Sequence, residues 1–193
     1  MNHLSRLVEA LEQGGVVACP TETWLGLLAD AHNPDAIERV AILKGRPKDL
    51  PIALLVPDAA SVASLCAQPP NEATQGLMDR YWPGPLTVLV HAASTLSPRL
   101  TRDGKVGVRV PGPSPAADLV RAFGGPLTAT SANLSGQPPV ASVDGLPDSI
   151  RRGLAAEVPG ESPGGEPSTL LDATVSPIQI LRQGAVTIPS TAL

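Results

Sequence analysis

The sequence is poor in aromatic residues. It contains one Tyr, one Phe and two Trp, which together make up 2% of the chain. Its core must therefore be built from Leu, Val, Ile and Ala. Charged residues are also scarce at 17%, but hydrophobic residues reach 42%, a balance typical of a globular chain rather than a disordered one. The length of 193 residues is that of one domain with a sizeable core.

Cysteine is nearly absent, since only Cys19 and Cys66 are present. Their separation fits neither a metal site nor a redox motif, so we expect two buried free thiols in the reducing cytoplasm. The sequence also lacks an apolar run of membrane-spanning length, and we expect no membrane partner. The amphipathic N-terminus, MNHLSRLVEALEQGG, predicts an ordinary helix rather than a signal peptide.

Positive charge is in short supply as well. Fourteen Lys and Arg residues stand against 18 Asp and Glu, for a formal net charge of -4. This balance argues against a surface that binds nucleic acid throughout, but it allows a local basic cleft. One stretch departs from the acidic background: LKGRPKDLP (43–51) brings Lys44, Arg46 and Lys48 together between an expected helix and an expected strand.

Hydrophobic periodicity predicts interleaved helices and strands. The expected helices are the N-terminal one, which ends at Gly14-Gly15, and the segments 34–43, 58–66, 71–81, 115–123 and 143–153. The expected strands are 16–19, 52–56, 86–90, 106–110, 126–131, 169–173 and 178–182, with a loop at 159–167. This pattern predicts an α/β (α+β) fold: a single domain over 1–186 with a twisted mixed β-sheet flanked by helices, followed by a flexible tail at 187–193.

Polar clusters follow several of the expected strands. They are PTET (20–23), TSANLSG (130–136) and PSTLLD (167–172), and Arg109 lies within VGVRVP. Ligands bind at strand ends in open α/β sheets. Each cluster also has an ordinary structural explanation: a capped or Asx-type turn, a solvated basic loop, or an arginine that braces the sheet through a carboxylate such as Asp172.

Taken together, the motifs resemble those of the YrdC-like family, specifically the bacterial threonylcarbamoyl-AMP synthases. The matching stretches are PTETWLGL (20–27), LKGRPKDLP (43–51), YWPGPLT (81–87), VRVP (108–111), TSANLSG (130–136), PSTLLD (167–172) and LRQGA (181–185). The resemblance runs from about residue 4 to residue 186. It implies a YrdC/RibB-like fold, in which a twisted sheet carries a deep concave cleft. Longer relatives have an extra C-terminal domain, for which we expect no counterpart here.

The resemblance also implies a reaction. L-threonine, bicarbonate and ATP give threonylcarbamoyl-AMP and pyrophosphate, and a tRNA threonylcarbamoyl-transferase complex moves the product's acyl group onto the adenosine beside the anticodon. ATP is then a substrate, Mg²⁺ arrives with it, and no tightly bound cofactor is expected. The acidic balance predicts weak tRNA contact by the protein alone. The alternative is a non-catalytic RNA-binding module of ribosome or tRNA maturation. A carbamoyl-transfer domain of hydrogenase maturation is disfavoured, because the chain lacks zinc-finger-like cysteine motifs.

Displacement at phosphorus requires positioning and neutralisation of charge rather than a covalent nucleophile. A lysine and an arginine two positions apart in extended chain point the same way, so we assign Lys44 and Arg46 to the phosphates and expect Lys48 to face solvent. The resemblance completes the predicted catalytic set, Lys44, Arg46, Ser131 and Asn133. It adds Arg182 and Lys105 as ATP contacts.

The amino-acid substrate needs a cation for its carboxylate. Arg109 suits this role because its guanidinium is planar and can bind both carboxylate oxygens. The resemblance adds Thr23, Ser168 and the backbone at Ala129 as threonine contacts.

The chain also departs from the family pattern. Trp24 and Leu25 replace the valine and tyrosine of PTETVYGL, which changes one wall of the expected threonine pocket. Leu50 and Leu55 stand where many longer relatives carry asparagine and histidine.

Overall fold

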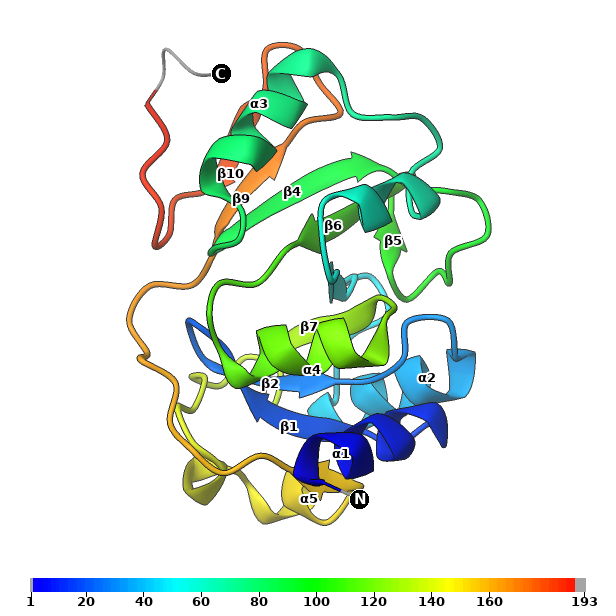
Figure 1. Ribbon diagram of the computed structural model, residues 1–193, viewed down its shortest axis with the longest axis vertical. Coiled ribbons are helices and arrows are strands. Elements are labelled where there is room, and N and C mark those ends of the chain that lie inside the picture. The colour runs from blue at the N-terminus through cyan, green and yellow to red at the C-terminus, as the bar shows by residue number, and fades with distance from the viewer. Residues whose placement is uncertain (1, 190–193) are drawn as a thin grey trace.

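A computed structural model describes residues 2–189 and contains one mixed β-sheet with helices on both of its faces (Figure 1). The strand order is β10-β9-β4-β6-β3-β7-β2-β1-β8, and β5 pairs with β6. The strands are β1 Val17–Pro20, β2 Leu25–Leu28, β3 Ala53–Leu55, β4 Leu86–His91, β5 Thr101–Arg102, β6 Lys105–Arg109, β7 Leu127–Ser131, β8 Ala156–Glu157, β9 Thr169–Asp172 and β10 Gln179–Arg182. The predicted mixed α/β class is confirmed.

The helices begin where the sequence supplies caps. The α-helices are α1 His3–Glu12, α2 Pro34–Lys44, α3 Glu72–Tyr81, α4 Pro115–Phe123 and α5 Asp148–Arg151. Side chains of Asn2, Asn33, Asn71 and Ser114 accept hydrogen bonds from backbone N–H groups in the first turns of α1 to α4, as Asn and Ser do at N-caps. Proline occupies the first turn of α2 and of α4, where its missing N–H costs nothing.

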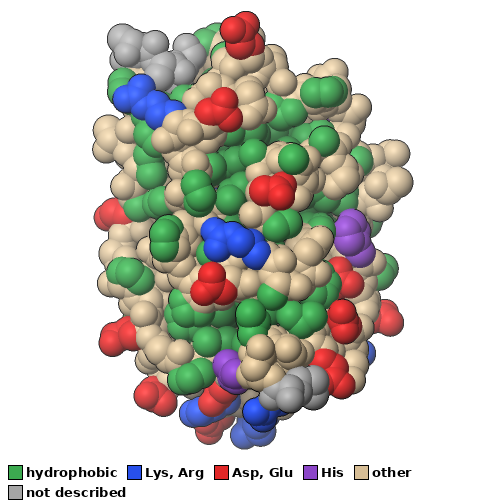
Figure 2. Space-filling model, in the orientation of Figure 1, with side chains coloured by type: hydrophobic (Ala, Val, Ile, Leu, Met, Phe, Trp, Pro, Cys, Tyr) green, Lys and Arg blue, Asp and Glu red, His purple; other side chains and the backbone are tan. Residues whose placement is uncertain are grey.

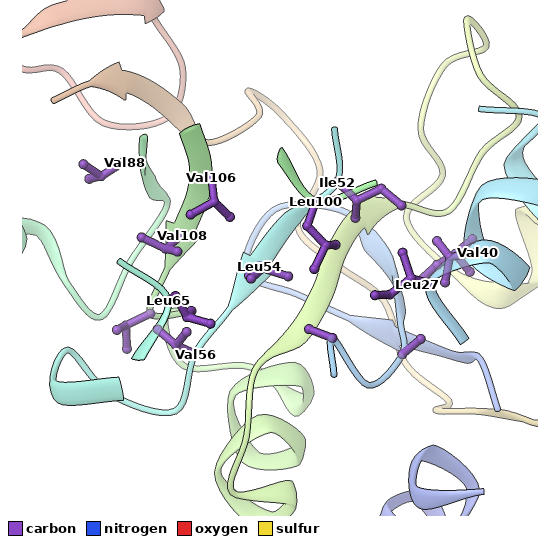
Figure 3. Close-up of a cluster of buried hydrophobic side chains, with 14 of the residues drawn as sticks. Leu27, Val40, Ile52, Leu54, Val56, Leu65, Val88, Leu100, Val106 and Val108 are labelled. Carbon is purple, nitrogen blue, oxygen red and sulfur yellow. The ribbon is translucent and has the colours of Figure 1, made fainter. Parts of the chain in front are cut away.

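Side chains of the strands alternate between two buried clusters. The larger cluster packs α2 and α3 against one face of the sheet and includes Leu27, Leu54, Val88 and Val108 (Figure 3). The smaller cluster lies on the other face, where α1 and α4 pack against β1, β2 and β7. Successive residues of a strand point to opposite faces, so β2 and β3 contribute to both clusters, whereas β4 and β6 contribute only to the larger one.

Three strands were missed by the sequence prediction, and two of the predicted helices differ in the structure. Strands β2, β5 and β8 were not predicted, because β5 and β8 are two residues long and β2 follows the polar PTET turn directly. The helix expected at 58–66 is a short 3-10 helix, Ala60–Ser64. The helix expected at 143–153 is divided into a 3-10 turn, Val143–Gly145, and α5. Packed chain continues past residue 186, since Ile188 is 4% exposed and joins the larger cluster; residues 190–193 lie outside the described part.

Both cysteines are free thiols, as predicted. Cys19 is buried and Cys66 half-buried. Burial raises the pKa of Cys19 to about 12, so this thiol is not a nucleophile at neutral pH. Among residues 2–189, no helix is both long enough and apolar enough to span a membrane.

The core position of β3 leads to a stability prediction. Leu54 is fully buried in the central strand, whereas Ile42 on α2 is 69% exposed. We expect Leu54→Ala to lower the free energy of unfolding by about 2–5 kcal/mol, because it removes buried methyl groups and leaves a cavity. The matched control, Ile42→Ala, should change it by less than about 0.5 kcal/mol. Urea denaturation measures both, and equal losses would contradict the assigned core.

Candidate active site

A cavity of about 330 Å³ lies on the face of the sheet that carries the smaller cluster. Alternate residues of the central strands form its floor, including Gly26, Ala53, Gly107 and Ala129. Small residues are required there: a Cβ at Gly107 would lie 3.3 Å from side-chain atoms of both neighbouring strands. The strands thus provide a hollow where α1 and α4 do not cover the sheet.

Most of the predicted site residues line this one cavity, although they come from distant parts of the chain. They are Thr23, Arg46, Arg109, Ala129, Ser131, Ser168 and Arg182. The pairing of β2 with β7, of β7 with β3 and of β3 with β6 brings the first five of them together. The pairing of β6 with β4, of β4 with β9 and of β9 with β10 adds Ser168 and Arg182. Lys44, Asn133 and Lys105 are not among the lining residues.

Lys44 points into the protein. It is the last residue of α2, which ends because Gly45 adopts a left-handed conformation with φ 56°, the usual geometry of a helix C-cap. The Lys44 Nζ donates to the backbone oxygens of Ser131 and Asn133 and, at 3.2 Å, to Asn133 Oδ1. The expected extended geometry of residues 44–46 is therefore wrong: a helix end directs Lys44 into the 131–135 loop.

The contacts of Lys44 use all of its hydrogen-bonding capacity. An ammonium has three N–H donors, and the loop supplies three oxygens. The backbone oxygen of Lys44 also accepts from Ser135 N at 2.8 Å. Lys44 consequently joins the KGR and SAN motifs into one unit. Burial lowers its pKa to about 8, and the charge of Arg46 acts in the same direction.

Arg46 closes its own loop and still faces the cavity. Its Nε donates to the backbone oxygen of Leu50 at 3.0 Å, and Nη2 donates to that of Pro51 at 2.8 Å. A guanidinium has five N–H donors, so donors remain for a ligand. Burial lowers the pKa of Arg46. Lys48 is exposed, as predicted.

Arg182 and Ser168 form the other wall of the cavity. Arg182 Nη2 donates to the backbone oxygen of Ser168 at 2.8 Å and to its Oγ at 3.3 Å. The Ser168 hydroxyl lies 2.9 Å from Thr87 Oγ1. Thr87 also lines the cavity, but the sequence analysis did not assign it. Its position within YWPGPLT, one of the quoted motifs, was the available signal.

Arg109 is buried at the centre of the cavity lining, with 8% of its side chain exposed. Its Nη1 lies 3.5 Å from Glu22 Oε1, so the carboxylate beside it is Glu22 and not the suggested Asp172. Asp172 instead pairs with Lys105, whose Nζ lies 2.7 Å from Asp172 Oδ2. This ion pair removes Lys105 from the group of cations that line the cavity.

Trp24, one of the departures from the family pattern, lines the cavity and contacts the 159–167 loop. Its indole Nε1 donates to the backbone oxygen of Gly165 at 3.1 Å. Gly164 N donates to the Thr23 backbone oxygen at 2.8 Å. Leu55 also lines the cavity, whereas Leu50 is 40% exposed and lies outside the lining.

Comparison with known proteins adds a family to this geometry. The family model Sua5_yciO_yrdC, described as "Telomere recombination", matches residues 9–184. The chain belongs to the Sua5/YciO/YrdC family. The predicted resemblance is thereby confirmed.

Curated relatives are similar over nearly the whole chain. A threonylcarbamoyl-AMP synthase of Vibrio campbellii is 36% identical over 95% of this chain and 100% of its own length. A threonylcarbamoyl-AMP synthase of Bacillus subtilis is 35% identical over 95% of this chain but only 54% of its own length. The chain therefore spans about half of the longer relatives.

Solved structures agree with the fold. Pyrococcus abyssi Sua5 complexed with L-threonine matches with a TM-score of 0.87 and 31% identity, over 94% of this chain and 54% of that one. Escherichia coli YciO, at 24% identity and a TM-score of 0.83, covers 94% of this chain and 89% of its own and supports the fold alone.

The depressed pKa of Lys44 predicts a pH dependence of stability. Below pH 8 the folded and unfolded chains both hold the proton, and the folded chain carries the cost of burying the ammonium. The ordinary pKa of lysine is about 10.4, so between pH 8 and that value the unfolded chain keeps the Lys44 proton while the folded chain loses it. Because the unfolded chain then binds more protons, the contribution of Lys44 to the free energy of unfolding increases with pH. We expect the difference in unfolding free energy between the wild type and Lys44→Met to shift by about 1–2 kcal/mol in favour of the wild type from pH 7 to pH 9.5. Denaturant titrations at both pH values measure it; parallel profiles would show that Lys44 does not titrate there.

Proposed function

We propose that this chain is an L-threonylcarbamoyl-AMP synthase, which makes threonylcarbamoyl-AMP and pyrophosphate from L-threonine, bicarbonate and ATP. The observation that carries the proposal is the convergence of three arginines, Arg46, Arg109 and Arg182, on one cavity. All three substrates bring negative charge, and guanidinium groups bind carboxylates and phosphates through paired hydrogen bonds. The names of the curated relatives and the threonine complex of P. abyssi Sua5 support the same activity.

The proposed roles divide the cavity into a nucleotide end and an amino-acid end, which meet where Arg182 is hydrogen-bonded to Ser168. At the nucleotide end, Arg46, Ser131 and Arg182 contact ATP. Lys44 holds Ser131 and Asn133 in place, and its ammonium adds positive charge directly behind these two residues. Lys105 has the weakest support as an ATP contact, because it pairs with Asp172. Mg²⁺ enters with ATP, whose phosphate oxygens are its usual ligands.

At the amino-acid end, Arg109 binds the threonine carboxylate, while Thr23, Ser168 and the backbone at Ala129 contact the rest of the molecule. A site that hydrogen-bonds a substrate hydroxyl rejects an analogue lacking it, because its own polar groups would be left unpaired. Thr23 and Ser168 are both buried. Their hydroxyls give the pocket a means of selecting threonine over amino acids with plain apolar side chains.

The chemistry consists of two bond-forming steps. The threonine nitrogen forms a C–N bond with the carbon of bicarbonate, with loss of water, to give a carbamate. A carbamate oxygen then attacks the α-phosphorus of ATP, the bond to the bridging oxygen breaks, and pyrophosphate leaves. Arg46 and Arg182 are held by hydrogen bonds to backbone oxygens, so their remaining donors stabilise the charge on the leaving phosphates without reorganisation.

The product's proposed use is threonylcarbamoyl transfer to tRNA by a partner complex. An RNA-binding module without catalysis is the alternative. On the face shown in Figure 2, Lys and Arg side chains are few and lie among acidic and hydrophobic ones. The cations that line the cavity are three arginines, of which Arg109 is buried, Arg46 half-buried and Arg182 exposed. This distribution favours a small anionic substrate over a polyanion.

A substrate-omission assay tests the proposal. We expect pyrophosphate release only when ATP, L-threonine and bicarbonate are all present, because the carbamate must form before it can attack phosphorus. The assay measures pyrophosphate with each substrate left out in turn. Undiminished ATP turnover without threonine would point to another activity, and tight tRNA binding without turnover would support the RNA-binding module.

Arg46 and Lys48 provide a matched pair in the basic stretch. We expect Arg46→Ala to reduce turnover by about 10²–10³-fold, the usual effect of removing one fixed charge contact from a transition state. Lys48→Ala removes the same charge two residues away at an exposed position and should change turnover less than twofold. Equal mild losses in the two variants would mean that the stretch is a solvated loop. Melting temperatures check that both variants fold.

A further inference from the structure

Glu22 is a buried carboxylate without a hydrogen-bond partner. Only 11% of its side chain is exposed, and neither Oε1 nor Oε2 is hydrogen-bonded. Arg109, its neighbour, has an Nε that is also unpaired. The two side chains meet through Arg109 Nη1 and Glu22 Oε1 at 3.5 Å, an ion pair without a hydrogen bond. Buried polar groups are normally paired, so this arrangement calls for a physical explanation.

The surroundings hold Glu22 in place. The Thr21 hydroxyl oxygen accepts from Thr23 N at 3.1 Å and Trp24 N at 3.2 Å and donates to the Trp24 backbone oxygen at 2.7 Å, which closes the turn around Glu22. A Cβ at Gly112 would lie 3.3 Å from Glu22 Cγ. The absence of a side chain at position 112 therefore leaves room for the glutamate.

Arg109 needs a nearby anion. Burial lowers its pKa, and the positive charge of Arg182 acts in the same direction. The Glu22 carboxylate opposes both effects. Glu22 itself is not among the cavity-lining residues, whereas Arg109 is. The carboxylate thus stabilises the charged guanidinium from outside the cavity lining and leaves the cavity side open to a ligand.

We infer that Glu22 is a positioning residue, whose carboxylate holds the Arg109 guanidinium in place to bind the carboxylate of the amino-acid substrate. The inference rests on the proposed function, because it assigns that substrate to Arg109. The contact of 3.5 Å leaves the N–H donors of Arg109 uncommitted before the substrate arrives. A guanidinium between two carboxylates can satisfy both, since it has five donors.

Calorimetric titration of the full chain with L-threonine, and separately with a non-hydrolysable ATP analogue, tests the inference. We expect Glu22→Gln, which removes the charge but keeps the shape, to raise the threonine Kd about tenfold. The Kd of the ATP analogue should stay within about twofold of the wild-type value, because Glu22 acts only through Arg109. A general structural defect would instead weaken both ligands and lower the melting temperature.

Glu166→Gln is the matched control. Glu166 is exposed and adjoins Pro167, which lines the cavity. The variant removes the same charge close to the site without touching Arg109, so both Kd values should remain unchanged. If Glu166→Gln weakened threonine binding as much as Glu22→Gln, the effect would come from net charge and the positioning role would be overturned.

A double-mutant cycle shows whether Glu22 acts through Arg109. In an Arg109→Lys background, which has lost the planar fork, Glu22→Gln should change the threonine Kd by less than about twofold. An undiminished tenfold effect in that background would overturn the inference. Glu22→Asp keeps the charge and replaces Glu22→Gln if the glutamine variant fails to fold. The threonine Kd of Glu22→Asp should lie between those of the wild type and of Arg109→Lys. A Kd as high as that of Arg109→Lys would overturn positioning by the charge of Glu22.

Wild-type controls separate this inference from the proposed function. Wild-type protein that binds no threonine and releases no pyrophosphate would refute the proposed function and the inference together. Wild-type protein that is active, with a glutamine variant of unchanged threonine Kd, would refute the role of Glu22 alone.

Discussion

The hydrogen bonds that the Lys44 ammonium donates to Ser131 and Asn133 are the interaction on which the rest of the site depends. The ammonium lies at the end of α2, where a cation is favoured by the helix dipole, and binds the backbone oxygen of Ser131, the last residue of β7, and two oxygens of Asn133 in the loop that follows. Because β7 lies next to β3 in the sheet, this contact fixes the segment before β3 against the end of its neighbour. Arg46 and Ser131 are then held on the same side of the cavity by the backbone of both segments.

The cavity collects cations where the sheet is open. Arg46, Arg109 and Arg182 come from three distant segments of the chain that line the same cavity. Arg109 is the buried one of the three, and its burial strengthens its interaction with an anion. Burying the Arg109 guanidinium costs solvation energy, and one carboxylate, Glu22, lies beside it. The three arginines and Glu22 leave a net positive charge at the cavity. Binding of an anion neutralises this charge and so offsets the desolvation cost that the folded protein already carries.

The sequence predicted the strands and helices that have strong periodicity, and the quoted motifs identified most of the cavity lining. It did not predict the direction of Lys44, although Gly45 after the last helical residue is a signal for a left-handed helix cap. The partner of Arg109 was unpredictable for a different reason. Glu22 and Arg109 are far apart in the chain, and Glu22 lies on the turn between β1 and β2. Asp172 is nearer to Arg109 in the strand order, so only the three-dimensional course of that turn places Glu22 beside Arg109. Strands β5 and β8 are too short for periodicity to detect.

A net acidic chain that places its arginines around one cavity can bind anions more selectively than a chain with a basic surface. Salt screens exposed charges within about 10 Å at ordinary ionic strength, whereas buried charges are screened much less. An exposed basic surface would also attract any polyanion. Guanidiniums placed around a hollow whose floor carries the small residues Gly26, Ala53 and Gly107 favour anions that fit this hollow. The acidic net charge of the chain and the local positive charge of the cavity are thus compatible, because shape and charge together favour small anions over polyanions.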